Sequence, residues 1–311
     1  DKKYMSKIAF IFPGQGAQKA GMGKDFYEGT STGREVFDRA SELLGFSMPE
    51  LCFEENDRLD ITEYTQAAMV TTSIAMMKVL MEETGIRPDV AAGLSLGEYC
   101  ALYAAGVMSA DDAITTVRKR GILMQGEVPV GVGAMAAILA LDASKIEEVL
   151  GGMEGVEIAN YNCPGQIVIS GKKEAVELAC EKLKEAGAKR TVMLNVSGPF
   201  HSGMLVEAGK KLGEFLEHVE LSDPQIPYVA NVTASYVTDK AEVKDLLARQ
   251  VSSSVRWEQS VRAMLADGVD TFIEIGPGKT LAGFMRKITR DVKVVNIETL
   301  DDVKALKENG L

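Results

Sequence analysis

Short, nearly continuous apolar runs alternate with longer segments of helical character along this chain. Apolar runs at 7–12, 88–92 and 271–275 each end in a glycine-rich segment. Such runs are typical of strands buried on both faces of a parallel sheet. Helices are expected between them, at 22–44, 62–84 and 109–124, and the second is apolar on most faces, which indicates burial. This alternation predicts an α/β protein with a parallel-sheet core.

The pattern changes after Gly131. Strands are predicted at 134–141, 156–161, 166–170 and 190–194, and helices at 143–150 and 172–186. Their order, β-α-β-β-α-β, is that of the ferredoxin-like split unit. Glycine and proline residues mark both ends of this segment. We therefore predict a small ferredoxin-like domain at 130–197, inserted in a discontinuous large domain formed by 5–129 and 198–311.

Composition limits the classes of function. The chain has 311 residues and a net charge of −11, which argues against nucleic acid as the main partner. No apolar run is long enough to span a membrane, and the N-terminal residues do not resemble a signal peptide, so we expect a cytoplasmic protein. The four cysteines are scattered without a Cys-x-x-Cys pair. We interpret them as reduced thiols rather than disulfides or a metal site.

The stretch Gly93-Leu-Ser-Leu-Gly97 is the first candidate for chemistry. It fits the Gly-x-Ser-x-Gly nucleophile elbow and lies between an apolar run and a segment rich in helix-forming residues. The two glycines let strand and helix pass close together around Ser95. The N–H group of Leu96 and one from the loop at Gln15 are placed to bind an oxyanion. The alternative interpretation is a glycine-rich turn with an incidental serine.

One histidine is a candidate base. The chain has only two, and His218 lies in a charged segment typical of a surface helix. His201 lies in a loop where the chain re-enters the large domain, and functional histidines are common in such loops. The alternative is a hydrogen-bonded structural histidine. No Asp motif clearly completes a triad, but a backbone carbonyl can hold the second imidazole nitrogen. Ser95 and His201 together predict acyl transfer through a serine ester, to water or to another nucleophile.

Five motifs occur in a fixed order: Phe12-Pro-Gly-Gln-Gly-Ala-Gln18, Gly93-Leu-Ser-Leu-Gly-Glu-Tyr99, Val117-Arg-Lys-Arg-Gly121, Gly198-Pro-Phe-His-Ser202 and Glu274-Ile-Gly-Pro-Gly-Lys279. The set resembles the malonyl-CoA:acyl-carrier-protein transacylases of bacterial type II fatty-acid synthesis, over nearly the whole chain. The resemblance implies a hydrolase-like α/β large domain with an inserted ferredoxin-like small domain. One position departs from the family, which usually has histidine before the nucleophile. Here that residue is Leu94, and we expect only a change in local packing or tuning.

The resemblance also implies roles for individual residues. Ser95 is the expected nucleophile and His201 the base and then the acid, oriented by the backbone carbonyl of Gln250. Arg120 is expected to bind the malonyl carboxylate through a two-pronged salt bridge, a geometry that guanidinium suits. The expected oxyanion hole consists of the backbone N–H groups of Gln15 and Leu96. The expected secondary pocket positions are Gln66, Asn162 and Phe200, and the bulk of the phenylalanine would crowd an α-methyl group.

The implied activity is that of an acyl-carrier-protein S-malonyltransferase. Such an enzyme moves the malonyl group from malonyl-CoA to the phosphopantetheine thiol of acyl carrier protein, in ping-pong order through a malonyl-serine, with no permanently bound cofactor and no metal. The alternatives are a serine hydrolase, for which Arg120 would have no purpose, and a non-catalytic acyl-binding relative. With histidine as the base, activity is expected to fall as the pH drops through roughly 6–7.

The negative net charge of the chain limits how it can bind the expected carrier protein. The carrier protein is acidic in this family and this chain is acidic too, so binding needs a local basic patch. The sequence does not rank the candidates, which are Lys189, Arg190, Lys279, Arg286 and Lys287. We expect a monomer with malonyl-CoA and acyl carrier protein as partners, and neither nucleic acid nor membrane.

Overall fold

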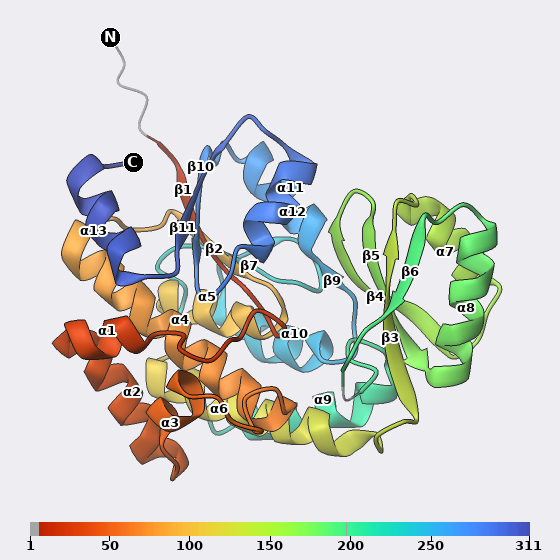
Figure 1. Ribbon diagram of the computed structural model, residues 1–311, viewed down its shortest axis with the longest axis horizontal. Helices are drawn as coiled ribbons and strands as arrows, with labels where there is room; N and C mark the ends of the chain where they lie inside the picture. The colour runs from red at the N-terminus through yellow and green to blue at the C-terminus, as the bar shows by residue number, and fades with distance from the viewer. Residues whose placement is uncertain (1–5, 197) are drawn as a thin grey trace.

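The computed structural model describes residues 6–196 and 198–311, which form two sheets with helices packed against them (Figure 1). The predicted α/β class with a parallel-sheet core is confirmed. Two of the predicted domain limits fall on residues 5 and 197, which lie outside the described residues. Within the described ranges, no helix is both long and apolar enough to cross a membrane.

The larger sheet has six strands in the order β11-β10-β1-β2-β7-β8. All neighbours are parallel except β7 and β8. The predicted apolar runs form its centre, and the last strand along the chain, β11, lies at one edge. The strands are β1 (Ile8–Phe12), β2 (Val90–Gly93), β7 (Tyr228–Val229), β8 (Tyr236–Val237), β10 (Thr271–Ile275) and β11 (Lys293–Ile297).

Helices cover both faces of this sheet because alternate residues of each strand point to opposite sides. On one face, Phe10 and Phe12 share a core with α4 (Thr62–Thr84), α5 (Glu98–Ala104) and α6 (Ala110–Glu127). On the other face, Ala9 and Ile11 pack with α11 (Trp257–Ala266) and α12 (Thr280–Ile288). The remaining helices of this part are α1 (Lys24–Gly29), α2 (Ser31–Leu44), α3 (Met48–Phe53), α9 (Val206–Leu216), α10 (Val243–Gln250) and α13 (Leu300–Asn309).

Two helix predictions have different outcomes. Residues 62–84 form α4 with the predicted bounds, and most of its side chains are buried as expected. The helix expected at 22–44 is interrupted at Thr30, whose extended backbone ends α1. The Thr30 side chain accepts a hydrogen bond from the N–H of Gly33 and so caps α2. The break falls at Gly29-Thr-Ser-Thr-Gly33, a run of weak helix formers and capping residues, so the sequence carried a signal for it.

The smaller sheet has the order β6-β3-β5-β4-β9, and neighbours among its first four strands are antiparallel. This is the strand order of the predicted ferredoxin-like unit. Strand β9 (Val255–Arg256) joins it from a distant part of the chain, in parallel with β4, which the sequence did not predict. The unit consists of β3 (Gly133–Leu139), α7 (Ala143–Gly151), β4 (Val156–Cys163), β5 (Gln166–Lys172), α8 (Lys173–Glu185) and β6 (Arg190–Met193).

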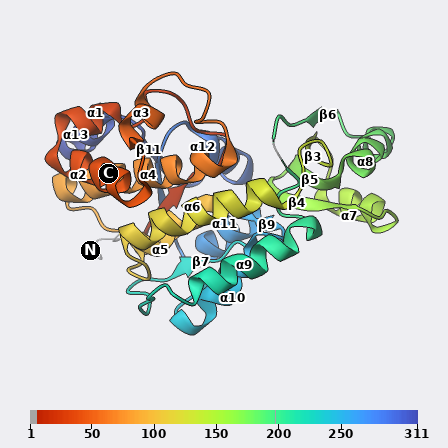
Figure 2. The ribbon, with the colours of Figure 1, turned by 90° about the horizontal axis from the view of Figure 1, so that it is seen from below.

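We propose the predicted division of the chain into a small domain at 130–197 and a large domain at 5–129 and 198–311. The smaller sheet has its own apolar core, to which Ile138, Ile169 and Leu183 contribute. In Figure 2, α6 and α9 lie side by side, and both extend from the larger sheet toward the smaller one. These two helices lead into and out of the predicted insertion.

Candidate active site

The Gly-x-Ser-x-Gly segment forms a tight turn after β2. Ser95 has a φ of 56°, a conformation that non-glycine residues rarely adopt. A Cβ on Gly93 would lie 1.9 Å from the carbonyl carbon of Gly97, and a Cβ on Gly97 would lie 2.4 Å from the carbonyl oxygen of Phe12. Both positions therefore require glycine. Leu94, the departure from the family pattern, lies partly buried among apolar residues of α11 and α12.

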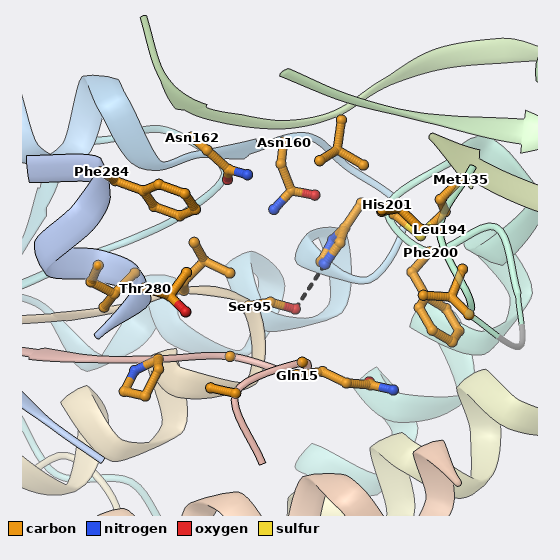
Figure 3. A pocket seen from close by; sticks show the side chains of 18 of the residues that line it. Gln15, Ser95, Met135, Asn160, Asn162, Leu194, Phe200, His201, Thr280 and Phe284 are labelled. Atoms are coloured by element: carbon orange, nitrogen blue, oxygen red, sulfur yellow. Dashed lines mark hydrogen bonds between the residues drawn. The ribbon is translucent and has the colours of Figure 1, made fainter. Parts of the chain in front are cut away.

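Ser95 and His201 are within hydrogen-bond distance. The Ser95 Oγ lies 2.8 Å from the His201 Nε2, and the dashed line in Figure 3 marks this hydrogen bond. The His201 Nδ1 lies 2.8 Å from the backbone carbonyl oxygen of Gln250. A carbonyl can only accept, so Nδ1 carries the hydrogen and Nε2 presents its lone pair to the serine hydroxyl. The arrangement has the geometry of a nucleophile and a general base whose imidazole is held by a backbone group.

The environment of His201 keeps its imidazole neutral. Burial and, secondly, the positive charge of Arg120 lower the pKa of His201 to about 4. Burial weakens the solvation of the imidazolium ion, and the positive charge of Arg120 repels it. The pKa lies below the range of roughly 6–7 expected from the sequence. A sequence does not reveal how deeply a loop histidine is buried or which charge faces it.

Arg120 is buried beside Ser95, with 1% of its surface exposed. Its guanidinium donates to the Gln66 Oε1 at 2.8 Å, to the Gln250 Oε1 at 3.0 Å and to the Ser95 Oγ at 3.2 Å. Burial lowers the pKa of Arg120. No carboxylate of the described residues forms an ion pair with it. A buried cation whose hydrogen-bond partners are neutral favours the binding of an anion.

The neighbouring Arg118 has a different environment. Its guanidinium lies over the rings of Tyr64 and Phe46, 4.6 and 5.3 Å from their centroids, and donates to the backbone carbonyl of Glu63. Arg118, Lys119 and Arg120 are successive residues of α6, so their side chains point in different directions and at most one of them can enter a site. The geometry gives that place to Arg120.

The backbone N–H groups of Ser95 and Leu96 differ in their hydrogen bonding. Ser95 donates its N–H to the Asn231 Oδ1 at 2.8 Å. Within the described chain, the N–H groups of Leu96 and Gln15 have no acceptor. The Gln15 side chain donates to the Thr62 Oγ1 at 2.9 Å, which holds the loop after β1. The oxyanion role of Gln15 and Leu96 stays a prediction, and this geometry is compatible with it.

A cavity of about 320 Å³ opens over Ser95, between the two sheets (Figure 3). The predicted residues Gln15, Ser95, Arg120, Asn162, Phe200 and His201 line it. Three other predicted residues, Gln66, Leu96 and Gln250, lie buried outside the lining, and two of them contact Arg120. The Oδ1 of Asn162 is buried and has no hydrogen-bond partner within the described chain.

Several lining residues were missed by the sequence reasoning. Asn160 reaches the cavity from β4 beside the predicted Asn162, and the spacing of two residues on a strand was the available signal. Thr280 and Phe284 enter from α12, one turn apart, after the glycine-rich segment that follows β10. Asn231, which holds the Ser95 N–H, follows a strand parallel to β2. Ligands bind at the carboxyl ends of such strands, so its position was a usable clue.

The fold and this site together are typical of an acyl-transferring enzyme, with a serine within hydrogen-bond distance of a histidine and an arginine. Comparison with known proteins gives the family. The family model described as acyl transferase domain matches residues 9–306. A relative from Bacillus subtilis (strain 168), named malonyl CoA-acyl carrier protein transacylase, is 49% identical, over 98% of this chain and 99% of its own length.

Solved structures agree. An acyl carrier protein S-malonyltransferase from Vibrio cholerae has a TM-score of 0.94 at 41% identity, over 97% of this chain and 100% of the other. A malonyl-transacylase solved in complex with a type II PKS acyl-carrier protein has a TM-score of 0.95 at 37% identity, over 98% of this chain and 100% of the other. The chain belongs to the family of malonyl CoA-acyl carrier protein transacylases, and the resemblance seen in its motifs is confirmed.

Proposed function

We propose that this enzyme transfers the malonyl group from malonyl-CoA to the phosphopantetheine thiol of acyl carrier protein, for fatty-acid synthesis, through a malonyl ester of Ser95. The observation that carries the proposal is Arg120, a buried guanidinium 3.2 Å from the Ser95 Oγ with neutral hydrogen-bond partners. An acyl group with a terminal carboxylate would supply the missing negative charge. The names of the relatives support the same substrate and acceptor.

The first half-reaction acylates the serine. His201 takes the hydroxyl proton at Nε2 while the Ser95 oxygen attacks the thioester carbonyl carbon. The N–H groups of Gln15 and Leu96 stabilise the oxyanion of the tetrahedral intermediate. The intermediate collapses with cleavage of the carbon–sulfur bond, and CoA leaves as a thiol with the proton from His201. No net proton is gained or lost by the enzyme.

The second half-reaction reverses the first with a different thiol. The phosphopantetheine thiol gives its proton to the His201 Nε2, and its sulfur attacks the ester carbonyl carbon. Collapse breaks the bond to the serine oxygen, which recovers the proton from the imidazole. The backbone carbonyl of Gln250 accepts the hydrogen of the His201 Nδ1 in both half-reactions. The proton that is exchanged with Ser95 and the thiols is therefore always the one on Nε2.

Arg120 selects the acyl group in this scheme. A bidentate pairing with the malonyl carboxylate satisfies the guanidinium and orients the reacting carbonyl over Ser95. Gln66, which accepts from Arg120, holds the guanidinium from behind. Asn162 and Phe200 are the proposed secondary contacts with the acyl thioester, since both line the cavity.

Carrier-protein binding is proposed for the exposed basic end of α12. Arg286 and Lys287 are exposed near its last turn, and Lys279 is exposed just before its start. Thr280 and Phe284 of the same helix line the cavity, so an acidic partner bound there would have a short path to Ser95. Lys189 and Arg190 are exposed on the small domain and stay further candidates. The proposal includes a monomer in the cytoplasm.

Charge reversal tests this docking surface. Arg286→Glu with Lys287→Glu should raise the KM for carrier protein and leave CoA release from malonyl-CoA unchanged in a single turnover. Lys304→Glu on α13 is the matched control, because it reverses an exposed charge on another helix. Equal KM values for carrier protein in the double variant and the control would show that carrier protein does not bind at the basic end of α12.

The fate of the malonyl group tests the proposed function. Purified enzyme is mixed with malonyl-CoA, and CoA release is followed with and without phosphopantetheinylated carrier protein. One burst equal to the enzyme concentration is expected without carrier, and steady turnover to malonyl-carrier protein with it. Free malonate released as fast as CoA would instead show a hydrolase. The absence of a burst would show an acyl-binding protein without catalysis.

A further inference from the structure

Asn231 lies behind the nucleophile and outside the substrate cavity. It follows β7 at the carboxyl end of the sheet, next to β2, and its side chain is fully buried. The Oδ1 accepts the Ser95 N–H at 2.8 Å, and the Nδ2 donates to the Gly93 carbonyl at 2.8 Å. One amide side chain thus bridges the two sides of the nucleophile turn.

The same Oδ1 also accepts from the Nε2 of Gln250, at 3.1 Å. That Nε2 donates in addition to the backbone carbonyl of Ser95, at 2.9 Å. The Oε1 of Gln250 then accepts from Arg120 at 3.0 Å. A continuous set of hydrogen bonds therefore leads from the nucleophile turn through Asn231 and Gln250 to the guanidinium.

The direction of every bond in this set is fixed. The Ser95 N–H can only donate and the Gly93 carbonyl can only accept, so the amide of Asn231 has one orientation. The Asn231 Oδ1 and the Ser95 carbonyl oxygen both face Gln250 and can only accept, so the Gln250 Nε2 must point toward them. The Gln250 Oε1 then points toward Arg120, which can only donate. If the Gln250 amide turned over, its NH₂ group would face the guanidinium and two donors would oppose each other.

The backbone of Asn231 is held as firmly as its side chain. Its N–H donates to the Glu98 Oε1 at 2.6 Å, in the first turn of α5. Its carbonyl accepts the N–H of Arg256, in β9, at 3.0 Å. Burial prevents solvent from replacing any of these bonds, so the position of the side chain amide is set from three directions.

We propose that Asn231 is a positioning residue that couples the nucleophile turn to carboxylate recognition, by fixing the side-chain orientation of Gln250 and through it the guanidinium of Arg120. The inference rests on the proposed function, because it takes Arg120 as the group that receives the substrate carboxylate. It assigns the Gln250 side chain a task separate from that of its backbone carbonyl, which holds His201.

A double-mutant cycle tests the coupling. The measured quantity is the ratio of kcat/KM for malonyl-CoA to that for acetyl-CoA, in wild type, Asn231→Ala, Gln250→Ala and the double variant. Asn231→Ala should lower kcat/KM for malonyl-CoA roughly a hundredfold, the usual effect of a small misplacement of catalytic groups. Each single variant should lower the ratio about tenfold or more, and the double variant no further than Gln250→Ala alone.

Two further variants separate positioning from general damage. Val229→Ala on β7 removes buried apolar contacts nearby without touching the hydrogen bonds, so it should lower thermal stability and leave the ratio at its wild-type value. Asn231→Ser keeps a polar group at the turn but is too short to reach Gln250 as well. Asn231→Ser should lower the ratio as Asn231→Ala does. It replaces the alanine variant in the test if that variant does not fold.

The rate of Ser95 modification by a fluorophosphonate gives a readout that is independent of malonyl chemistry. Wild-type enzyme that reacts with the fluorophosphonate but shows no preference for malonyl-CoA would contradict the proposed function. A wild-type preference that Asn231→Ala and Asn231→Ser leave unchanged would overturn the positioning role. Ratio effects that multiply in the double variant would show that Asn231 acts independently of Gln250, and would overturn the coupling.

Discussion

The guanidinium of Arg120 lies 3.2 Å from the Oγ of Ser95, close enough to donate a hydrogen bond to the nucleophile itself. The proposed carboxylate-binding group is thus next to the proposed nucleophile. A malonyl group is short enough to bridge this distance, with its carboxylate on the arginine and its carbonyl over the serine. The same proximity explains why the charge of Arg120 affects His201.

Arg120→Ala should change substrate choice more than it harms the chemistry. A bidentate pair contributes two charge-assisted hydrogen bonds, each worth about 1.5–3 kcal/mol, so kcat/KM for malonyl-CoA should fall roughly a hundredfold or more. Acetyl-CoA does not use this contact and should react equally well or better, because a buried unpaired cation is removed. Lys at this position should rescue only partly, since an ammonium cannot form the same fork.

Arg118→Ala is the matched control for this measurement. It removes an arginine from the same helix whose guanidinium lies over Tyr64 and Phe46, away from the nucleophile. The ratio of kcat/KM for malonyl-CoA and acetyl-CoA should stay at the wild-type value. If Arg120→Ala loses both substrates in equal proportion, or Arg118→Ala collapses the ratio, the assignment of the carboxylate site to Arg120 is wrong.

His201→Ala should lower the rate of serine acylation by about two to four orders of magnitude, the usual worth of a general base. The fold should survive, because the loop backbone is held by the bond from the His201 N–H to the Val251 carbonyl, which does not involve the imidazole. Stopped-flow measurement of CoA release in a single turnover checks the rate, and circular dichroism checks the fold. An acylation rate within tenfold of wild type would exclude His201 as the base.

The pH dependence should reflect the buried environment of His201. Its pKa of about 4 means that kcat/KM should stay constant from pH 8 to pH 5 and fall only below, where the imidazole becomes protonated and cannot accept a proton. Removing the positive charge of Arg120 removes one cause of the low pKa. Arg120→Ala should therefore raise the pKa of His201, toward its ordinary value of 6.5, and move the acid limb to higher pH.

Acetyl-CoA is the suitable substrate for this comparison, because its reaction does not depend on the carboxylate contact. Profiles of kcat/KM against pH are measured for wild type and Arg120→Ala. Acid limbs at the same pH in both proteins would show that the charge of Arg120 does not act on His201.

Glu98→Gln should change how stability depends on pH. Burial raises the pKa of Glu98 from 4.5 to about 8, so the folded state keeps a proton that the unfolded state releases. The free energy of unfolding therefore decreases as the pH rises from 4.5 to about 8. Glutamine stays neutral and can still accept the N–H of Asn231, so the variant should lack this decrease.

Chemical denaturation of both proteins at pH 5, 7 and 9 tests this prediction. His201 contributes a slope of opposite sign below pH 6.5, but it does so in both proteins and cancels in the difference. The variant should gain stability over wild type as the pH rises. A difference that is the same at all three values would show that Glu98 has an ordinary pKa.

Local patterns account for the parts of this protein that the sequence predicts. The glycines around Ser95 signal a turn because their neighbours leave no space for a Cβ, and the apolar runs signal buried strands because helices cover both faces. These features depend on residues close together in the chain. The same holds for the start of the helix expected at 109–124, where the Ser109 side chain caps α6 by accepting the N–H of Asp112.

The features that were missed depend on distant parts of the chain. Asn231 is important only because β7 lies parallel to β2, a pairing of segments far apart in sequence. Strand β9 forms only where the returning chain meets the edge strand β4. The low pKa of His201 requires both its burial and the approach of Arg120 from another helix. Motifs suggested candidate residues, most of which lie at or next to one cavity, and long-range packing determines their surroundings.

The most direct test of the central claim is where the malonyl group is attached. Enzyme is quenched in acid after a brief incubation with malonyl-CoA, digested, and mapped by peptide mass spectrometry. The account predicts one malonyl ester, on the peptide that contains Ser95, its loss when phosphopantetheinylated carrier protein is added before the quench, and no adduct in a folded Ser95→Ala variant. An adduct on another residue, or one that persists in Ser95→Ala, would contradict the account.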